Sequence, residues 1–115
     1  MRARLAIVFL AVSCCVGCCG RSQFRPCGPG LCNNALVPQG FAGVDFRPAC
    51  ARHDRCYGSP ACSRKACDDQ FRNDMLTACD GSPNRCLCRM KARHWYMQVR
   101  LFGLPSYWQA QHQTR

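Results

Sequence analysis

The chain is short, basic and rich in cysteine, with 115 residues, 13 Cys and a formal net charge of +10 at pH 7. This length favours one domain and excludes a large buried core, so disulfides are expected to stabilise the fold. The excess of cations, nearly all of them Arg, suits anionic lipid head groups, nucleic acid or acidic polymers, and charge alone does not choose among them.

The first twenty residues have the order of a secretory signal peptide: a basic start, an apolar run over residues 5–12 and then small residues. The apolar run is too short to cross a bilayer as a helix, which takes about 20 residues. We therefore expect residues 1–20 to be a signal peptide and residues 21–115 to form a secreted domain. Cys14 and the three residues before it loosely resemble a bacterial lipoprotein box, so a lipid anchor at Cys14 is the alternative.

Nine cysteines follow residue 20, together with 14 cations and six Asp, a net charge of +8. An odd number leaves one thiol free or in an intermolecular bridge. Zinc is the competing use of cysteine, but the spacings do not give two Cys-x-x-Cys pairs and an exported chain favours disulfides.

Residues 21–44 are rich in Gly, Pro and Asn and are expected to form a loop. A first helix is expected from Asp45, as its N-cap, to Tyr57, with Pro48 tolerated in the first turn. The Gly-Ser-Pro sequence at 58–60 ends it.

Two further helices are expected. Ser63 is a suitable cap for residues 64–79, where apolar side chains recur at helical spacing. Residues 85–102 carry an apolar stripe that includes Trp95 and Phe102, and the aromatic rings of this stripe are expected in the core rather than against lipid.

The C-terminal residues 106–115 are expected to be loosely ordered. Tyr107 and Trp108 are candidates to pack back on the domain, and they are also candidates for an interfacial anchor, since amphipathic rings favour the head-group level. His94 is expected to be an ordinary surface histidine.

The residues with the clearest chemistry lie on the first helix. Cys50, His53, Cys56 and Tyr57 share one face of it. If Cys56 bonds Cys67, the first two helices are held side by side and Asp68 comes within reach of His53. A carboxylate that fixes the tautomer of a histidine is the arrangement that a general base needs.

Asp54 points about 100° away from His53 around the helix, toward the preceding loop. That loop offers backbone carbonyls around Gly28 and Gly30. One carboxylate with several carbonyls and waters is a ligand set suited to calcium. Each feature alone is more often an ordinary polar edge beside a core, but their joint occurrence with these cysteine offsets favours a site.

The motif Cys-x-x-His-Asp-x-Cys-Tyr at 50–57 resembles the active-site helix of secreted phospholipases A2. Cys-Asp-x-x-Phe at 67–71 resembles the start of the second long helix of that family, and Cys-Gly-Pro-Gly at 27–30 resembles its calcium loop. The fold that this resemblance implies is mostly α: a disulfide-stapled pair of antiparallel helices, a third helix and a calcium-binding loop.

The resemblance also implies an activity, the calcium-dependent hydrolysis of the sn-2 ester of glycerophospholipids to a fatty acid and a lysophospholipid. His53 would activate the attacking water, Asp68 would orient His53, and Tyr57 would support the Asp68 carboxylate. The expected partner is a phospholipid surface, with a preference for anionic lipid and no nucleic acid, and the chain is expected to be a monomer.

The same resemblance places calcium between the Asp54 carboxylate and the carbonyls of Pro26, Gly28 and Gly30, where it would act as a Lewis acid and a template. The disulfides that it implies are Cys27–Cys50 and Cys56–Cys67.

Three departures from the family pattern point to its compact bacterial or fungal-like branches. Ala49 stands where most members have a second cysteine, residues 31–45 are longer and lack the usual glycine run, and the chain has no extended β-wing. Two other readings stay open: a non-catalytic, toxin-like scaffold, and a basic antimicrobial protein that docks on anionic membranes by charge, at roughly 1 kcal/mol per cation.

Overall fold

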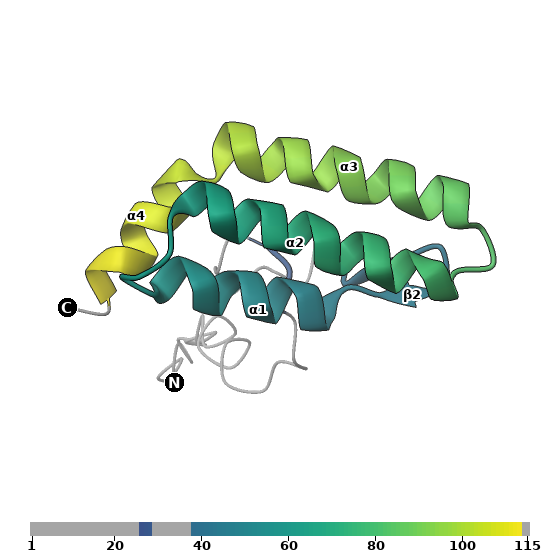
Figure 1. Cartoon of the computed structure of the whole chain (residues 1–115), viewed down its shortest axis with the longest axis horizontal. Coiled ribbons are helices and arrows are strands. Elements are labelled where there is room, and N and C mark those ends of the chain that lie inside the picture. Colours follow the sequence, from purple (N-terminus) through teal and green to yellow (C-terminus); the bar gives the residue numbers. More distant parts are fainter. Residues whose placement is uncertain (1–25, 29–37, 114–115) are drawn as a thin grey trace, which may run out of the picture.

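The computed structural model describes residues 26–28 and 38–113, and it confirms the mostly helical fold. Three long helices lie side by side and alternate in direction, with α2 between the other two, and a shorter helix closes one end (Figure 1). They are α1 (Arg47–Gly58), α2 (Arg64–Ala78), α3 (Arg85–Phe102) and α4 (Leu104–Gln113). The expected signal peptide 1–20, with Cys14, lies outside the described residues, as does Gly30.

A two-residue hairpin precedes the helices. Strands β1 (Gly40–Phe41) and β2 (Val44–Asp45) are antiparallel, with Gly40 opposite Asp45. Because Asp45 belongs to this hairpin, the expected N-cap is wrong by one residue, and α1 begins after Phe46, which has no capping side chain. The Asp45 carboxylate still accepts the Arg47 backbone N–H at 2.9 Å, so it satisfies one of the free donors at the start of the helix.

The second and third helices begin and end close to where the sequence places them. The Ser63 hydroxyl accepts the Ala66 backbone N–H and caps α2, which passes into the short 3-10 turn η2 (Cys79–Gly81). The Asn84 side chain caps α3 in the same way through the Leu87 N–H. None of the helices described is long and apolar enough to cross a membrane.

The expectation of a loosely ordered C-terminus is wrong, because residues 104–113 form α4. Pro105 is tolerated in its first turn. The Tyr107 ring meets Tyr57 edge to face at 5.3 Å, and its hydroxyl donates to the Cys62 carbonyl. The Gln111 amide donates to the carbonyls of Tyr57 and Ser59 at the end of α1. Contacts with α1 and the α1–α2 connection therefore stabilise a helix that has a weak local pattern.

The core lies between the three long helices and contains Phe46, Phe71, Met75 and Ala92, with Trp95 packed against it. Phe46 and Trp95 meet edge to face, with ring centroids 5.6 Å apart. Phe102 departs from the expected apolar stripe, because it is 74% exposed at the end of α3 rather than buried in the core.

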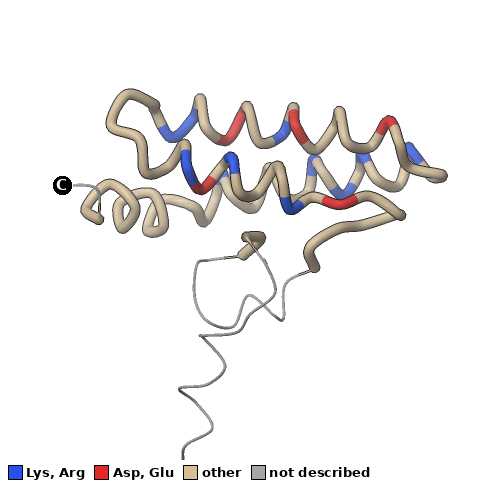
Figure 2. The backbone as a smooth tube through the Cα atoms, turned by 90° about the horizontal axis from the view of Figure 1, so that it is seen from below, with Lys and Arg blue, Asp and Glu red and all other residues tan. Residues whose placement is uncertain are grey.

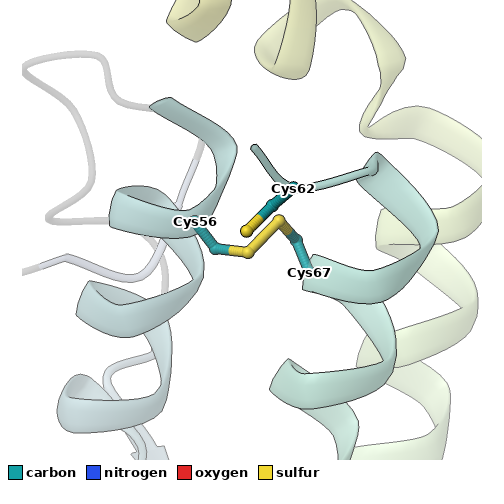
Figure 3. A group of neighbouring side chains, drawn as sticks. All are labelled: Cys56, Cys62 and Cys67. Atoms are coloured by element: carbon teal, nitrogen blue, oxygen red, sulfur yellow. A yellow bond between two sulfur atoms is a disulfide. The ribbon is translucent and has the colours of Figure 1, made fainter. Parts of the chain in front are cut away.

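Three disulfides are present among the described residues. Cys27–Cys50 and Cys56–Cys67 are the pairs that the family resemblance implies, and Cys79–Cys88, which joins η2 to α3, was not anticipated. Cys62 carries a free thiol, and Figure 3 shows its side chain directed at the Cys56–Cys67 disulfide. The three sulfur atoms lie within 4.8 Å of one another.

Candidate active site

The centre of the site is a histidine and a carboxylate from two neighbouring helices. His53 lies on the inner face of α1 and Asp68 in the second turn of α2, next to the Cys56–Cys67 disulfide that joins these helices. His53 Nε2 and Asp68 Oδ1 are 2.7 Å apart. The structure thus brings together the two residues that the sequence predicts as base and orienting acid.

The Asp68 carboxylate is fully buried and well supplied with donors. The Tyr57 hydroxyl donates to Oδ1, and Arg100 Nη1 donates to Oδ2 at 2.8 Å. Burial opposes ionisation, but hydrogen bonds from His53, Tyr57 and Arg100 outweigh it and hold the pKa of Asp68 below its usual value of 3.8. Asp68 is therefore an ionised acceptor at neutral pH.

The same contacts keep Tyr57 neutral. Burial, followed by its hydrogen bond to Asp68, raises the pKa of the Tyr57 hydroxyl, so Tyr57 acts as a donor to the carboxylate. The His53 ring is packed between the Tyr57 ring at 4.1 Å and the Phe71 ring at 4.6 Å, measured between centroids. These rings restrict how far the imidazole can rotate.

An ionised carboxylate can only accept hydrogen bonds, so His53 Nε2 carries the proton of that contact. Nδ1 is then the nitrogen with a free lone pair. His53 lines a cavity of about 520 Å³, together with Asp54 and residues of α3 such as Trp95 and Val99. The arrangement can accept a proton from a molecule bound in this cavity.

The described part of the predicted calcium loop reaches the same cavity, because Pro26 and Gly28 line it beside Asp54. Gly28 has φ 131°, a backbone conformation that favours glycine. The Gln39 amide accepts the Cys27 N–H and donates to the Cys27 carbonyl, and the Cys27–Cys50 disulfide ties the segment to α1. This short piece of loop is thus fixed one turn from His53.

Asp54 has the properties of a cation ligand. Part of the residue is exposed, but the protein around its carboxylate displaces water and raises its pKa to about 6, an effect that the neighbouring His53 partly offsets. Among residues 26–28 and 38–113, no donor bonds the Asp54 carboxylate. A partly desolvated carboxylate without a protein partner, beside loop carbonyls, fits calcium.

Three polar residues of this region were not found from the sequence. Arg100 contacts Oδ2 of Asp68, and Arg64 Nη1 lies 3.6 Å from that oxygen. Gln39 bonds the backbone of the loop at Cys27. Arg64 stands four residues before Asp68, a spacing that brings side chains together on a helix, so its contact had a usable signal. Arg100 lies 32 residues from Asp68 and Gln39 lies 12 residues from Cys27, and nothing local points to either contact.

The sequence around this site matches that of a known protein family. A family model described as prokaryotic phospholipase A2 matches residues 30–103, more than half of the chain. The chain belongs to this family. His53, Asp54, Tyr57 and Asp68 all lie within the matched range, so the phospholipase A2 pattern covers the buried pair and the candidate calcium carboxylate.

Two curated relatives are similar over a short stretch. Conodipine-P1 and Conodipine-P2 of Conus purpurascens are each 54% identical to the chain over 37 residues, which is 30% of this chain and 21% of theirs. The chain therefore spans about a fifth of the length of these curated relatives. No solved structure matches it significantly.

Proposed function

We propose that this phospholipase A2 family member hydrolyses the sn-2 ester of glycerophospholipids in a calcium-dependent reaction, with His53 as the general base. The observation that carries the proposal is the buried His53–Asp68 contact of 2.7 Å at the wall of the cavity. Membership of the family supports phospholipids as the substrate class.

In this mechanism His53 Nδ1 takes a proton from water as the water attacks the ester carbonyl, and the proton later passes to the leaving alcohol. Asp68 holds the ring and stabilises the imidazolium that forms. Tyr57 supports Asp68 and does not contact the ester. No acyl group is transferred to the protein.

Asp54 would hold calcium together with carbonyls of the loop at Pro26 and Gly28, and Gly30 is proposed as a further carbonyl ligand. When bound, calcium supplies a positive charge that polarises the ester and offsets the phosphate charge. The raised pKa of Asp54 and the absence of a protein partner for its carboxylate, among the described residues, support this assignment.

The test is fatty-acid release from vesicles of phospholipid labelled at sn-2 or at sn-1, with calcium or with chelator. The wild-type protein should release the sn-2 label with calcium, and His53→Gln should not. His94→Gln is the matched control, because His94 is exposed on α3 and bonds only Gln98 in the described structure. Absence of release from correctly oxidised, calcium-loaded protein would refute catalysis, and vesicle binding without release would favour the non-catalytic scaffold.

We further propose that the corner of α3 and α4 docks on a phospholipid surface. Large apolar side chains are exposed there, namely Leu101, Phe102, Leu104 and Trp108. Phe102 also lines the cavity, so the apolar corner borders the site. Lys and Arg are distributed along the three long helices, with Asp among them on α1 and α2 only (Figure 2), whereas α4 has no Lys, Arg or Asp.

Phe102→Ser should weaken binding to vesicles, because it removes an exposed ring that would enter the lipid. Met90→Ser is the control, since Met90 is 61% exposed but lies about 18 Å away along the same helix. Co-sedimentation with anionic and with zwitterionic vesicles measures both the apolar and the charge contribution. Equal binding by the two variants would refute the docking surface.

We also propose that the chain works outside the cytosol. Three disulfides in so short a domain are typical of an oxidising compartment. The mass of the exported protein distinguishes simple removal of residues 1–20 from a lipid-modified Cys14.

A further inference from the structure

Arg100 makes a direct contact with Asp68, although it has no role in the proposed reaction. Its Nη1 donates to Asp68 Oδ2 at 2.8 Å, on the side of the carboxylate opposite to His53 and Tyr57. Asp68 is fully buried, while the Arg100 side chain retains 27% exposure. The guanidinium thus covers the carboxylate oxygen that does not face His53.

A buried carboxylate that has only neutral donors keeps its full negative charge away from water, which strongly disfavours ionisation. The groups that face Asp68 come from each of the three long helices. They are His53 and Tyr57 on α1, Arg64 on α2 and Arg100 on α3. Of the two cations, Arg100 makes the direct hydrogen bond, whereas Arg64 Nη1 is 3.6 Å from Oδ2.

Neighbouring ionisable residues do not replace Arg100. Asp69 is turned away and bonds Lys65 and Tyr96, and on α4 Tyr107 packs on the Tyr57 ring without bonding the carboxylate. Arg100 is therefore the main counter-charge of the Asp68 carboxylate within residues 26–28 and 38–113.

Arg64 bonds the backbone near Arg100 and does not replace Arg100 as the hydrogen-bond donor to Asp68. Its guanidinium donates to the carbonyls of Val99 and Arg100 at 3.1 and 3.2 Å. These carbonyls belong to the last turn of α3, and that of Val99 also accepts the Gly103 N–H at 2.9 Å. The start of α2 is thus tied to the end of α3, and this tie fixes the backbone from which Arg100 reaches Asp68.

We propose that Arg100 is a positioning residue for the hydrolytic site: it holds Asp68 Oδ2, so that Oδ1 faces His53 and keeps its ring with Nε2 as donor and Nδ1 toward the cavity. The proposal rests on the function proposed above. Arg100 contacts neither water nor ester in this scheme and acts through Asp68 alone.

The test replaces Arg100 by Met, which keeps the length without charge or donors, and by Lys, which keeps the charge with one point donor. Arg93→Met is the matched control, because Arg93 is exposed on α3 two turns earlier and has no ion pair in the described structure. Circular dichroism and disulfide mapping establish that each variant is folded. The nitrogen chemical shifts of His53 report which ring nitrogen carries the proton, without any substrate.

We expect Arg100→Met to lower kcat by about 10- to 100-fold with KM unchanged, as for other residues that orient a functional side chain. A fraction of His53 should shift to the Nδ1–H tautomer. Arg100→Lys should recover part of kcat and most of the Nε2–H tautomer, and Arg93→Met should match the wild type.

Two outcomes would overturn the proposal: a folded Arg100→Met protein with wild-type kcat and tautomer, or an effect on KM alone. If Arg100→Met does not fold, the Arg100→Lys variant provides the test. A His53 that is mostly in the Nδ1–H tautomer in this variant, with unchanged kcat, would overturn the proposal, because the tautomer would then not matter for the reaction. Failure of the proposed function would look different. The wild type would then release no fatty acid, while the His53 tautomers would still decide whether Arg100 positions Asp68.

Discussion

Asp68→Asn is the substitution whose cost follows most directly from the structure. The amide has the shape of the carboxylate, but one of its two ends is a donor. That end must face either Arg100 Nη1, where the contact becomes donor against donor, or His53 and Tyr57, where the imidazole must take its other tautomer and the hydroxyl must turn to accept. Losing a hydrogen bond to a charged group costs about 1.5–3 kcal/mol.

The cost should fall in the lower half of that range, because Arg100 is 27% exposed and can recover water when its partner is lost. Urea denaturation of the oxidised protein at neutral pH measures the free energy of unfolding. Asp69→Asn is the matched control, since Asp69 bonds the exposed Lys65 and the Tyr96 hydroxyl near the surface, and this substitution should change the stability much less. A difference below about 1 kcal/mol between wild type and Asp68→Asn would refute the reasoning, since a buried carboxylate that balances a cation cannot be so cheap to neutralise.

The pH dependence gives a second check on the same substitution. The pKa of Asp68 lies below its unfolded value of 3.8, because hydrogen bonds from His53, Tyr57 and Arg100 outweigh burial. Its contribution to stability is therefore fully present above pH 3.8 and is lost as the pH falls through the folded pKa. The gap between wild type and variant should stay constant near neutrality and narrow below pH 3.8, and a gap that widens in acid would contradict the assignment.

Three further outcomes are expected. Gly103→Ala should destabilise the fold, because its Cβ would lie 2.7 Å from the Tyr57 hydroxyl and 2.4 Å from a backbone oxygen of α3, whereas Gly81→Ala, with no atom within 4 Å, should be nearly neutral in urea denaturation. Met75→Ala should cost about 2–5 kcal/mol in the same assay, since Met75 is fully buried, and a cost below about 1 kcal/mol would contradict the described core. Calcium affinity measured by calorimetry should fall roughly tenfold from pH 8 to pH 5, because a protonated Asp54, with a pKa of about 6, is not a ligand, and a pH-independent affinity would argue against Asp54.

The sequence was sufficient for the elements whose signals are local. Ser63 caps α2 as predicted, and α3 has the predicted bounds, because capping residues and helical periodicity act within a few residues. His53 and Tyr57 were placed on one face by the same periodicity. Asp68 was placed beside them because a disulfide between Cys56 and Cys67 leaves little freedom between the helices.

The missed features depend on contacts between distant residues. The segment 104–113 has little helical pattern of its own, and its order comes from Tyr107 and Gln111, whose partners lie 45 to 54 residues earlier. Arg100 lies off the apolar stripe of α3 and is used through a partner 32 residues away. Phe102 continues that stripe, but the helix ends there and its ring meets no core. Periodicity shows which side of a helix is apolar and does not show where the neighbouring helix stops.

The free thiol beside the Cys56–Cys67 disulfide has a practical consequence for work on this protein. A Cys62 thiolate can attack either sulfur of that bond, forming a new bridge to one cysteine while the other leaves as a thiol and takes up a proton. No external oxidant is needed, so purified material can become a mixture of isomers with the same mass. Only the isomer with Cys56 joined to Cys67 keeps α1 linked to α2 beside Asp68, and a Cys62→Ser background would remove this internal exchange.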